Sequence, residues 1–363
     1  IWIKYEQGSD YHSLWESLQG KNTGWCTAGE RTARSQLFNG DFYVYYTKDE
    51  NNQFTNPRIA IRMEGKSIIG EVRGIEKNQN LEANMIDIAD KKLDEFPSKS
   101  KYIKITHDMK LLTLIDNKSK NNQELNKEEL AFLYEIDGEI EGFGWQKDPR
   151  IEEIINKRGK KREDIAQIYN VNLEEVSLSC EEWWRNKKQT KVLYGNMNLR
   201  FISDSTDLYL PKIVIGNLDL GGLEKTDGLV LPETVIGSLY LNELKSTKNV
   251  IMPTMIKNQI YLEDVRDMAN LRLPISKKND VISFLPIPDS CFMEDDVYLK
   301  YCQDKAMQLE CSQKTSEKLE TGKVSNIRVM EKLVSIKDSI KFGLYNLKNR
   351  DGNKKLDSYW RKN

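Results

Sequence analysis

The second half of the chain contains a repeat of constant period. Four prolines, Pro211, Pro232, Pro253 and Pro274, follow one another at intervals of 21 residues. An apolar–x–apolar triplet precedes each proline, and a second apolar pair follows the first three prolines at a fixed distance. A fixed period of this length is typical of stacked repeats. The second pairs are Leu218 and Leu220, Leu239 and Leu241, and Ile260 and Leu262.

This periodicity predicts a β-solenoid over residues 195–274. Two apolar residues spaced two apart place both side chains on one face of a short strand. One repeat cannot bury that face alone, but stacked repeats bury a continuous core. We expect a strand to end just before each proline, because proline has no N–H to donate and turns the chain there. The alternative is an ordinary β-sandwich with regularly spaced strands.

The repeat resembles the leucine-rich and related short-coil solenoids of bacterial proteins, although it lacks their fixed asparagine after the strand. The resemblance covers residues 195–274, and it implies an extended face that binds a protein partner. On this basis we expect the segment 195–285 to dock such a partner. The sequence Pro286-Ile287-Pro288 then marks a boundary, after which 286–363 is expected to form a helical tail.

Residues 1–100 are expected to form a separate α+β domain, so the fold class of the whole chain is α+β. Helical spacing extends over 11–18, 27–37 and 81–96, and an aromatic strand follows at 42–47. Residues 58–63 alternate strictly between isoleucine or methionine on one side and arginine or alanine on the other. With the turn at 65–66 and the next strand at 67–73, this pattern predicts a hairpin.

Residues 101–194 are charged and are expected to be helical. Two helices are predicted at 109–115 and 127–136, the second capped by Asn126 with Glu129 three residues later. Pro149 suits the start of a further helix. Residues 162–176 have the spacing of a helix–turn–helix, which is either a DNA-reading element or an ordinary packing unit.

Cys26 is the candidate nucleophile. It lies in the segment Gly24-Trp25-Cys26-Thr27-Ala28, which opens a predicted helix, and unpaired N–H groups at a helix N-terminus favour a thiolate. Papain-like and transglutaminase-like enzymes resemble this order of a cysteine-led helix followed by strands. They carry a histidine on those strands, whereas His12 and His107 lie elsewhere in this chain. The alternative interpretation of Cys26 is a buried structural thiol.

The predicted hairpin carries a second candidate site. Arg58 and Arg62 share one strand face, and Glu71 and Arg73 share a face of the next strand. A guanidinium fork suits a phosphate or carboxylate, so this cluster predicts a ligand site that also includes Trp25 and Asn78. The alternative is an exposed sheet face with cross-strand charge pairs. Further residues that this cleft would include are Arg34, Asp41, Tyr43 and Tyr45.

The N-terminal motifs occur in an order that resembles the PcfJ-like proteins of plasmids and phages. The series consists of Gly24–Ala28, Gly40–Val44, Pro57–Ile61 and Glu71–Gly74, followed by Asn78, within residues 20–82. It departs from the family in having Trp25 before the cysteine and Thr27 after it. The resemblance implies a mobile-element or phage context and a ligand site around Cys26, Arg58, Glu71 and Arg73.

Composition limits the remaining classes of function. The net charge of −1 argues against a globally basic nucleic-acid binder, although residues 314–363 contain 13 lysines and arginines against six acids. This basic tail predicts a nucleic-acid contact or a solvated end. The five cysteines include no C-x-x-C pair, and there are two histidines, so we expect a cytoplasmic protein without metal or cofactor.

We therefore expect a multidomain interaction protein with its macromolecular partner on the repeat. The alternatives are a Cys26-dependent hydrolase or transferase and a nucleic-acid-binding protein. No apolar run is long enough to span a bilayer, so no membrane partner is expected. The chain begins at Ile1 without an initiator methionine, which predicts that it is part of a longer protein.

Overall fold

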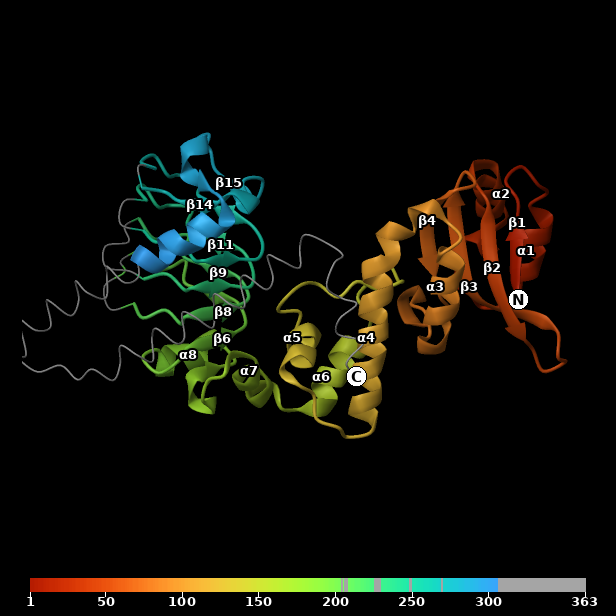
Figure 1. Cartoon of the computed structure of the whole chain (residues 1–363), viewed down its shortest axis with the longest axis horizontal. Coiled ribbons are helices and arrows are strands. Elements are labelled where there is room, and N and C mark those ends of the chain that lie inside the picture. Colours follow the sequence, from red (N-terminus) through yellow and green to blue (C-terminus); the bar gives the residue numbers. More distant parts are fainter. Residues whose placement is uncertain (204, 206–207, 225–229, 248–249, 269, 306–363) are drawn as a thin grey trace, which may run out of the picture. The chain divides into compact units, whose positions relative to one another are not determined.

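The computed structural model describes residues 1–203, 205, 208–224, 230–247, 250–268 and 270–305. The chain divides into two compact units, Ile1–Lys161 and Arg162–Asn363 (Figure 1). The first unit holds an antiparallel sheet and helices, and the second holds a β-solenoid, so the mixed class of the chain is confirmed. The predicted basic tail at 314–363 and Cys311 lie outside the described residues.

The N-terminal sheet has four antiparallel strands in sequence order. They are β1 (Trp2–Tyr5), β2 (Phe42–Lys48), β3 (Phe54–Glu64) and β4 (Ile68–Arg73). The predicted hairpin is confirmed as β3 and β4, and register pairs Arg62 with Glu71 and Ala60 with Arg73. These pairs share one face of the sheet because alternate residues of a strand point the same way.

Helices cover both faces of this sheet. Helices α1 (His12–Leu18) and α2 (Glu30–Asn39) bury Leu14 and Leu37 against Phe42 and Val44 on one face. On the opposite face Tyr43 contacts Phe96 edge-to-face. Lys92 of α3 (Ile86–Leu93) lies over the Tyr43 ring on this face. The segment after β4 also contains the 3-10 turns η2 (Lys77–Gln79), η3 (Ala83–Met85) and η4 (Pro97–Tyr102).

The helix predicted over 81–96 is shorter in the structure, where α3 covers Ile86–Leu93. The 3-10 turn η3 precedes it, and the helix ends at Leu93.

Three further helices complete the first unit: α4 (Ile103–Lys120), α5 (Lys127–Leu133) and α6 (Arg150–Arg158). The capping prediction for α5 is confirmed, because the Asn126 side chain accepts a hydrogen bond from Glu129 N–H and the Glu129 carboxylate accepts one from Asn126 N–H. Helix α6 begins directly after Pro149, as expected. Helix α4 extends well beyond both ends of the predicted range 109–115.

The helix–turn–helix predicted at 162–176 is wrong. Helix α7 (Lys161–Tyr169) ends before Asn170, whose φ of 52° reverses the chain. Only a 3-10 turn, η5 (Leu173–Glu175), follows, and the chain then enters the solenoid as strand β5 (Val176–Ser177). The residues predicted to form the second helix thus form a 3-10 turn and the start of the first solenoid strand.

Two parallel sheets form the solenoid, and Figure 1 shows their strands stacked along it. The first sheet has the order β12-β10-β8-β6-β5, and the second has the order β15-β13-β11-β9-β7. Register pairs Leu218 with Leu239 and Leu239 with Ile260, one coil apart, so these side chains form one fully buried column. About four coils with a spacing near 21 residues are present, as the proline repeat predicted.

The strands of the solenoid are short. In the first sheet, β5 is followed by β6 (Val192–Tyr194), β8 (Ile213–Ile215), β10 (Thr234–Val235) and β12 (Met255–Ile256). The second sheet contains β7 (Met197–Asn198), β9 (Leu218–Asp219), β11 (Leu239–Tyr240), β13 (Ile260–Tyr261) and β15 (Val281–Ile282). The remaining elements are α8 (Cys180–Asn186), β14 (Leu273–Pro274), η6 (Ile275–Lys277), η7 (Asp289–Cys291) and β16 (Phe292–Met293).

Among the described residues, no strand directly precedes any of the first three prolines, contrary to expectation. Strands of the first sheet instead begin two residues after Pro211, Pro232 and Pro253. The apolar residues before the prolines, such as Leu231 and Met252, are buried without strand pairing. Proline at the entry of a strand gives up no ladder donor, so its position before the strand costs no hydrogen bond.

Candidate functional site

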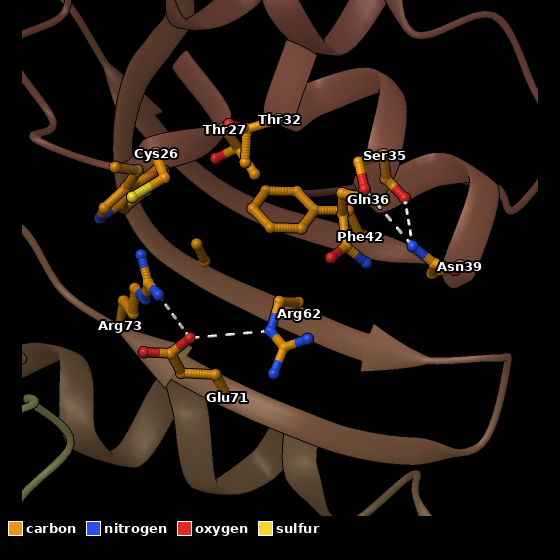
Figure 2. Close-up of a pocket in the computed structure, with 12 residues that line it drawn as sticks. Cys26, Thr27, Thr32, Ser35, Gln36, Asn39, Phe42, Arg62, Glu71 and Arg73 are labelled. Atoms are coloured by element: carbon orange, nitrogen blue, oxygen red, sulfur yellow. Dashed lines mark hydrogen bonds and ion pairs between the residues drawn. The ribbon is translucent and has the colours of Figure 1, made fainter. Parts of the chain in front are cut away.

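A cavity of about 240 Å³ lies between the 24–42 segment and the sheet face that carries Arg62, Glu71 and Arg73. Figure 2 shows Cys26 and Arg73 at one side of this cavity and Phe42 across it. It brings together Trp25, Cys26, Arg62, Glu71 and Arg73 from the sequence-predicted site. The other lining residues are Thr27, Thr32, Ser35, Gln36, Asn39, Phe42 and Ala60.

Trp25 anchors the cysteine segment to the end of β4. Its side chain is buried, and its indole Nε1–H donates to the carbonyl of Gly74 at 2.9 Å. The Gln79 side-chain amide donates to the Gly24 carbonyl at 3.1 Å. Two hydrogen bonds from far along the chain thus fix the residues that precede Cys26 against the sheet.

The expectation that Cys26 opens an α-helix is wrong. Cys26 begins a 3-10 turn, η1 (Cys26–Ala28), and α2 begins only at Glu30. Gly29 between them is extended, with φ −86° and ψ 132°, so it separates the two elements. The thiol is exposed, which also argues against the alternative of a buried structural cysteine.

The charged wall of the cavity consists of two arginines that share one carboxylate. Arg73 Nη2 lies 2.5 Å from Glu71 Oε2, and Arg62 Nε lies 3.6 Å from the same oxygen. The hydrogen bond with Glu71 raises the pKa of Arg73, and a smaller contribution comes from the adjacent Cys26 thiol. Glu64, outside the lining, lies 3.7 Å from Arg62 Nη2, so the two guanidinium groups are matched by two carboxylates, of which only Glu71 lines the cavity.

Thr27 lines the cavity and carries a buried hydroxyl without a partner. Its side chain is only 6% exposed, and its Oγ1 has no hydrogen-bond partner among the described residues. A buried hydroxyl without a partner costs about 1–3 kcal/mol. Thr27 therefore differs from its buried neighbour Gln36, whose amide donates to the carbonyls of Gly40, Asp41 and Met63.

Several predicted residues lie outside this cavity. Arg58 pairs with Glu82, and its Nη1 donates to Thr47 Oγ1 at 3.3 Å. Asn78 lies in η2 with a φ of 59° and does not line the cavity. Arg34 is exposed on α2 and is likewise not a lining residue.

The other expected cleft residues have structural partners. Asp41 is buried, with its carboxylate bonded to Gln7 N–H at 2.7 Å and 3.1 Å from Lys4 Nζ. Tyr43 and Tyr45 point to the opposite face of the sheet from Phe42, because strand residues alternate in direction. They therefore cannot contribute to the same cavity.

Neither histidine of the chain lies near the thiol. His12 pairs with Asp10 at 2.6 Å and His107 contacts Asp108 at 3.5 Å, and neither lines the cavity. Glu71 is the one carboxylate among the lining residues, and it is held by Arg73. The described lining residues thus supply anion-binding groups and a thiol but no uncommitted general base.

Sequence reasoning missed the residues from α2 that complete the cavity. Thr32, Ser35, Gln36 and Asn39 recur at helical spacing, so they lie along one side of α2. This polar stripe is the signal that identifies them, since a helix over a sheet normally presents apolar residues there.

The chain matches no known protein family, no curated protein and no solved structure. Within the described ranges, no group of three or more histidine, cysteine, aspartate or glutamate side chains is arranged to hold a metal ion. None of the described helices combines the length and apolar character that crossing a bilayer requires.

Proposed function

We propose that the N-terminal unit binds a small carboxylate-bearing molecule in the Cys26 cavity. The observation that carries this proposal is a cavity whose wall holds the guanidinium groups of Arg62 and Arg73, with Thr27, whose buried hydroxyl lacks a partner, among its lining residues. A ligand carboxylate would accept hydrogen bonds from the guanidinium N–H groups, and the Thr27 hydroxyl would reach the ligand after rotation about its Cα–Cβ bond. Planar guanidinium groups suit the two oxygens of a carboxylate, and both arginines reach the lining of this cavity.

The size and the apolar floor define the ligand further. A cavity of about 240 Å³ admits a small molecule and excludes a folded partner. Phe42 and Ala60 provide apolar surface beside the polar wall. This combination suits a short carboxylic acid with a few carbons better than a free inorganic anion.

The test is isothermal titration of the whole chain with small carboxylic acids, inorganic phosphate and the matching primary amides. We expect a carboxylic acid to bind and its amide to bind about tenfold more weakly or not at all. Thr27→Val and Arg73→Gln should each weaken binding, while Arg34→Gln, on the exposed side of α2, should leave it unchanged. Equal affinity for the acid and the amide would contradict the proposal.

We also propose that the solenoid docks a macromolecular partner. Support comes from the outward row of the second sheet, where Tyr240 and Tyr261 stack with ring centroids 4.4 Å apart. Aromatic side chains on an accessible sheet face are typical of binding surfaces. The leucine-rich character of the repeat and its protein-binding role are part of this proposal.

The second candidate function is a Cys26-dependent hydrolase or transferase. The exposed thiol at the cavity beside Arg73 favours it, and the lack of an uncommitted base among the described lining residues favours simple binding. Iodoacetamide labelling of the chain decides between them. An enzyme nucleophile should react much faster than the exposed thiol of a small peptide, and Arg73→Gln should slow it, whereas a plain binding site predicts peptide-like reactivity.

The remaining expectations are kept as proposals. The PcfJ-like resemblance, with its mobile-element context, rests on the order of the motif segments, which include 24–28 and 71–74. Nucleic-acid binding through 314–363 depends on residues outside the described part of the chain. A cytoplasmic location is consistent with four cysteines that are free among the described residues.

A further inference from the structure

The solenoid has a third side, outside its two sheets, where successive coils are joined by an isolated β-bridge. The hydrogen-bond ladder on this side does not continue into the next coil. Ser246 and Asp267, one coil apart, form this parallel bridge. The Asp267 N–H donates to the Lys245 carbonyl, and the Asp267 carbonyl accepts from the Thr247 N–H. One further period along the sequence reaches Pro288, which lines a cavity together with Asp267. Proline has no N–H, so the bond expected from residue 288 to the Arg266 carbonyl cannot form.

The interruption leaves backbone groups without partners. Within the described residues, neither the Arg266 carbonyl nor the Met268 N–H takes part in a hydrogen bond. In a parallel ladder these two groups point away from the preceding coil, because Asp267 uses both of its own groups toward that coil. They are the acceptor and donor that an added strand would need.

An open cavity of about 470 Å³ adjoins these groups. Its walls include Arg266, Arg272, Met268, Leu285 and Pro286. Neither arginine forms an ion pair with a carboxylate in the described part of the chain, although Arg272 donates to the Leu271 carbonyl at 2.7 Å. Asp267 also lines the cavity, and its carboxylate accepts from Ser246 Oγ at 2.8 Å.

We infer that this groove binds an extended acidic peptide segment of a protein partner, which adds a strand beside residues 266–268. This inference rests on the proposed docking role of the solenoid and names its site and chemistry. The peptide backbone would pair with the Arg266 carbonyl and the Met268 N–H, while its acidic side chains reach Arg266 and Arg272. Its apolar side chains would contact Met268 and Leu285.

Other occupants fit these features less well. A nucleic acid would satisfy the arginines but has no backbone amide to pair with the open ladder edge. The segment 314–363 of the chain has an excess of basic residues, so its charge does not complement the two arginines. An acidic strand satisfies both the charge and the hydrogen-bonding groups.

The experiment measures fluorescence anisotropy of a labelled peptide of alternating glutamate and valine with the full chain. We expect this peptide to bind, and a lysine–valine peptide not to bind. The double variant Arg266→Glu, Arg272→Glu should weaken binding about tenfold or more, and the matched control Arg185→Glu, Arg200→Glu should not. A peptide methylated at its backbone nitrogens should also lose binding, because it cannot pair with the ladder edge.

Several results would overturn the inference. A charge-neutral pair, Arg266→Gln and Arg272→Gln, is included with circular dichroism so that misfolding is recognised. If Tyr240→Ala with Tyr261→Ala abolished binding and the groove variants did not, the solenoid would still dock a partner but the groove would be wrongly assigned. If no variant mattered, both proposals would fail.

Tighter, groove-dependent binding of a thymidine oligonucleotide would assign the groove to nucleic acid. A groove-dependent dimer in light scattering would assign it to a second copy of the chain.

Discussion

Single side chains fix the candidate site more firmly than its local secondary structure does. The Gln36 amide ties α2 to the sheet through three backbone carbonyls, of Gly40, Asp41 and Met63. The Trp25 indole ties the cysteine segment to Gly74. The position of the thiol above the arginines therefore depends on two long-range hydrogen-bonding side chains.

The first prediction concerns Gln36. Gln36→Leu removes three hydrogen bonds from a side chain that is 6% exposed, so we expect a loss of about 2 kcal/mol in the free energy of unfolding. Urea denaturation measures this loss. The exposed Asn39→Ala on the same helix should cost clearly less, and an equal cost at both positions would contradict the anchoring role of Gln36.

The second prediction concerns acid stability. Burial alone would raise the pKa of Asp108, but hydrogen bonds from His107, the Glu141 N–H and Lys104 outweigh it and hold the pKa below its ordinary value. The unfolded carboxyl, with a pKa of about 3.9, takes up its proton at a higher pH than the folded one. The stabilisation by Asp108 is thus complete above that pH and is lost as the pH falls further.

Denaturation midpoints from neutral to acidic pH measure this effect. Asp108→Asn should lower stability at neutral pH and flatten the decline in acid. Asp87→Asn, at a carboxylate that is 75% exposed, should change the slope little. An unchanged acid slope in Asp108→Asn would contradict the assignment.

At the residue scale, sequence reasoning identified the charged half of the cavity but not its hydroxyl. Arg62, Glu71 and Arg73 are brought together by strand alternation and hairpin register, both of which a local pattern encodes. Arg58 follows the same alternation, but it forms an ion pair with Glu82, which comes later in the chain. Thr27 could not be recognised, because its lack of a partner depends on how α2 packs over the sheet.

Among the elements, the corner that precedes each strand of the second solenoid sheet restricts the choice of residue most strongly. Gly216 has a φ of 150°, and a Cβ there would lie 2.5 Å from the Gly195 carbonyl oxygen of the preceding coil. The successive coils carry Gly195, Gly216, Gly237 and Asn258 at this corner. Close backbone approach therefore explains Gly216 and Gly237, whereas a Cβ at Gly195 would meet only the Leu178 carbonyl oxygen at 3.9 Å.

The third prediction follows from this corner. Gly216→Ala should destabilise the second unit by about 2–3 kcal/mol, because it adds both backbone strain and a clash. Asn258→Ala, at the equivalent corner of a later coil, should change stability by no more than about 0.5 kcal/mol. Thermal unfolding compares the two variants, and similar losses in both would argue against a close-approach role for the glycines.

The solenoid elements also show why the sequence predicted the repeat correctly but placed the strands of the first sheet before the prolines instead of after them. The inward column of Leu218, Leu239 and Ile260 follows directly from the apolar period, since the core needs a side chain at each step. Apolar residues before two of the prolines, Leu231 and Met252, are also buried, so apolar pattern alone does not separate a strand from a buried loop.

For the molecule as a whole, the division into two units makes a thermodynamic prediction. Leu239→Ala deletes a fully buried side chain of the solenoid core and should cost about 2–5 kcal/mol in that unit. Differential scanning calorimetry should show this variant lowering one transition and Gln36→Leu lowering another, with additive effects in the double variant. One transition that both substitutions lower would mean that the units unfold together.

The stacking of equivalent coils has a consequence for how such a chain changes over generations. Each coil contacts the coils before and after it through the same register, from Leu218 to Leu239 to Ile260. An in-frame duplication or deletion of one whole period therefore joins surfaces that already match. Lineages can lengthen or shorten this half of the protein in whole steps, while the ends, and whatever they recognise, are inherited intact.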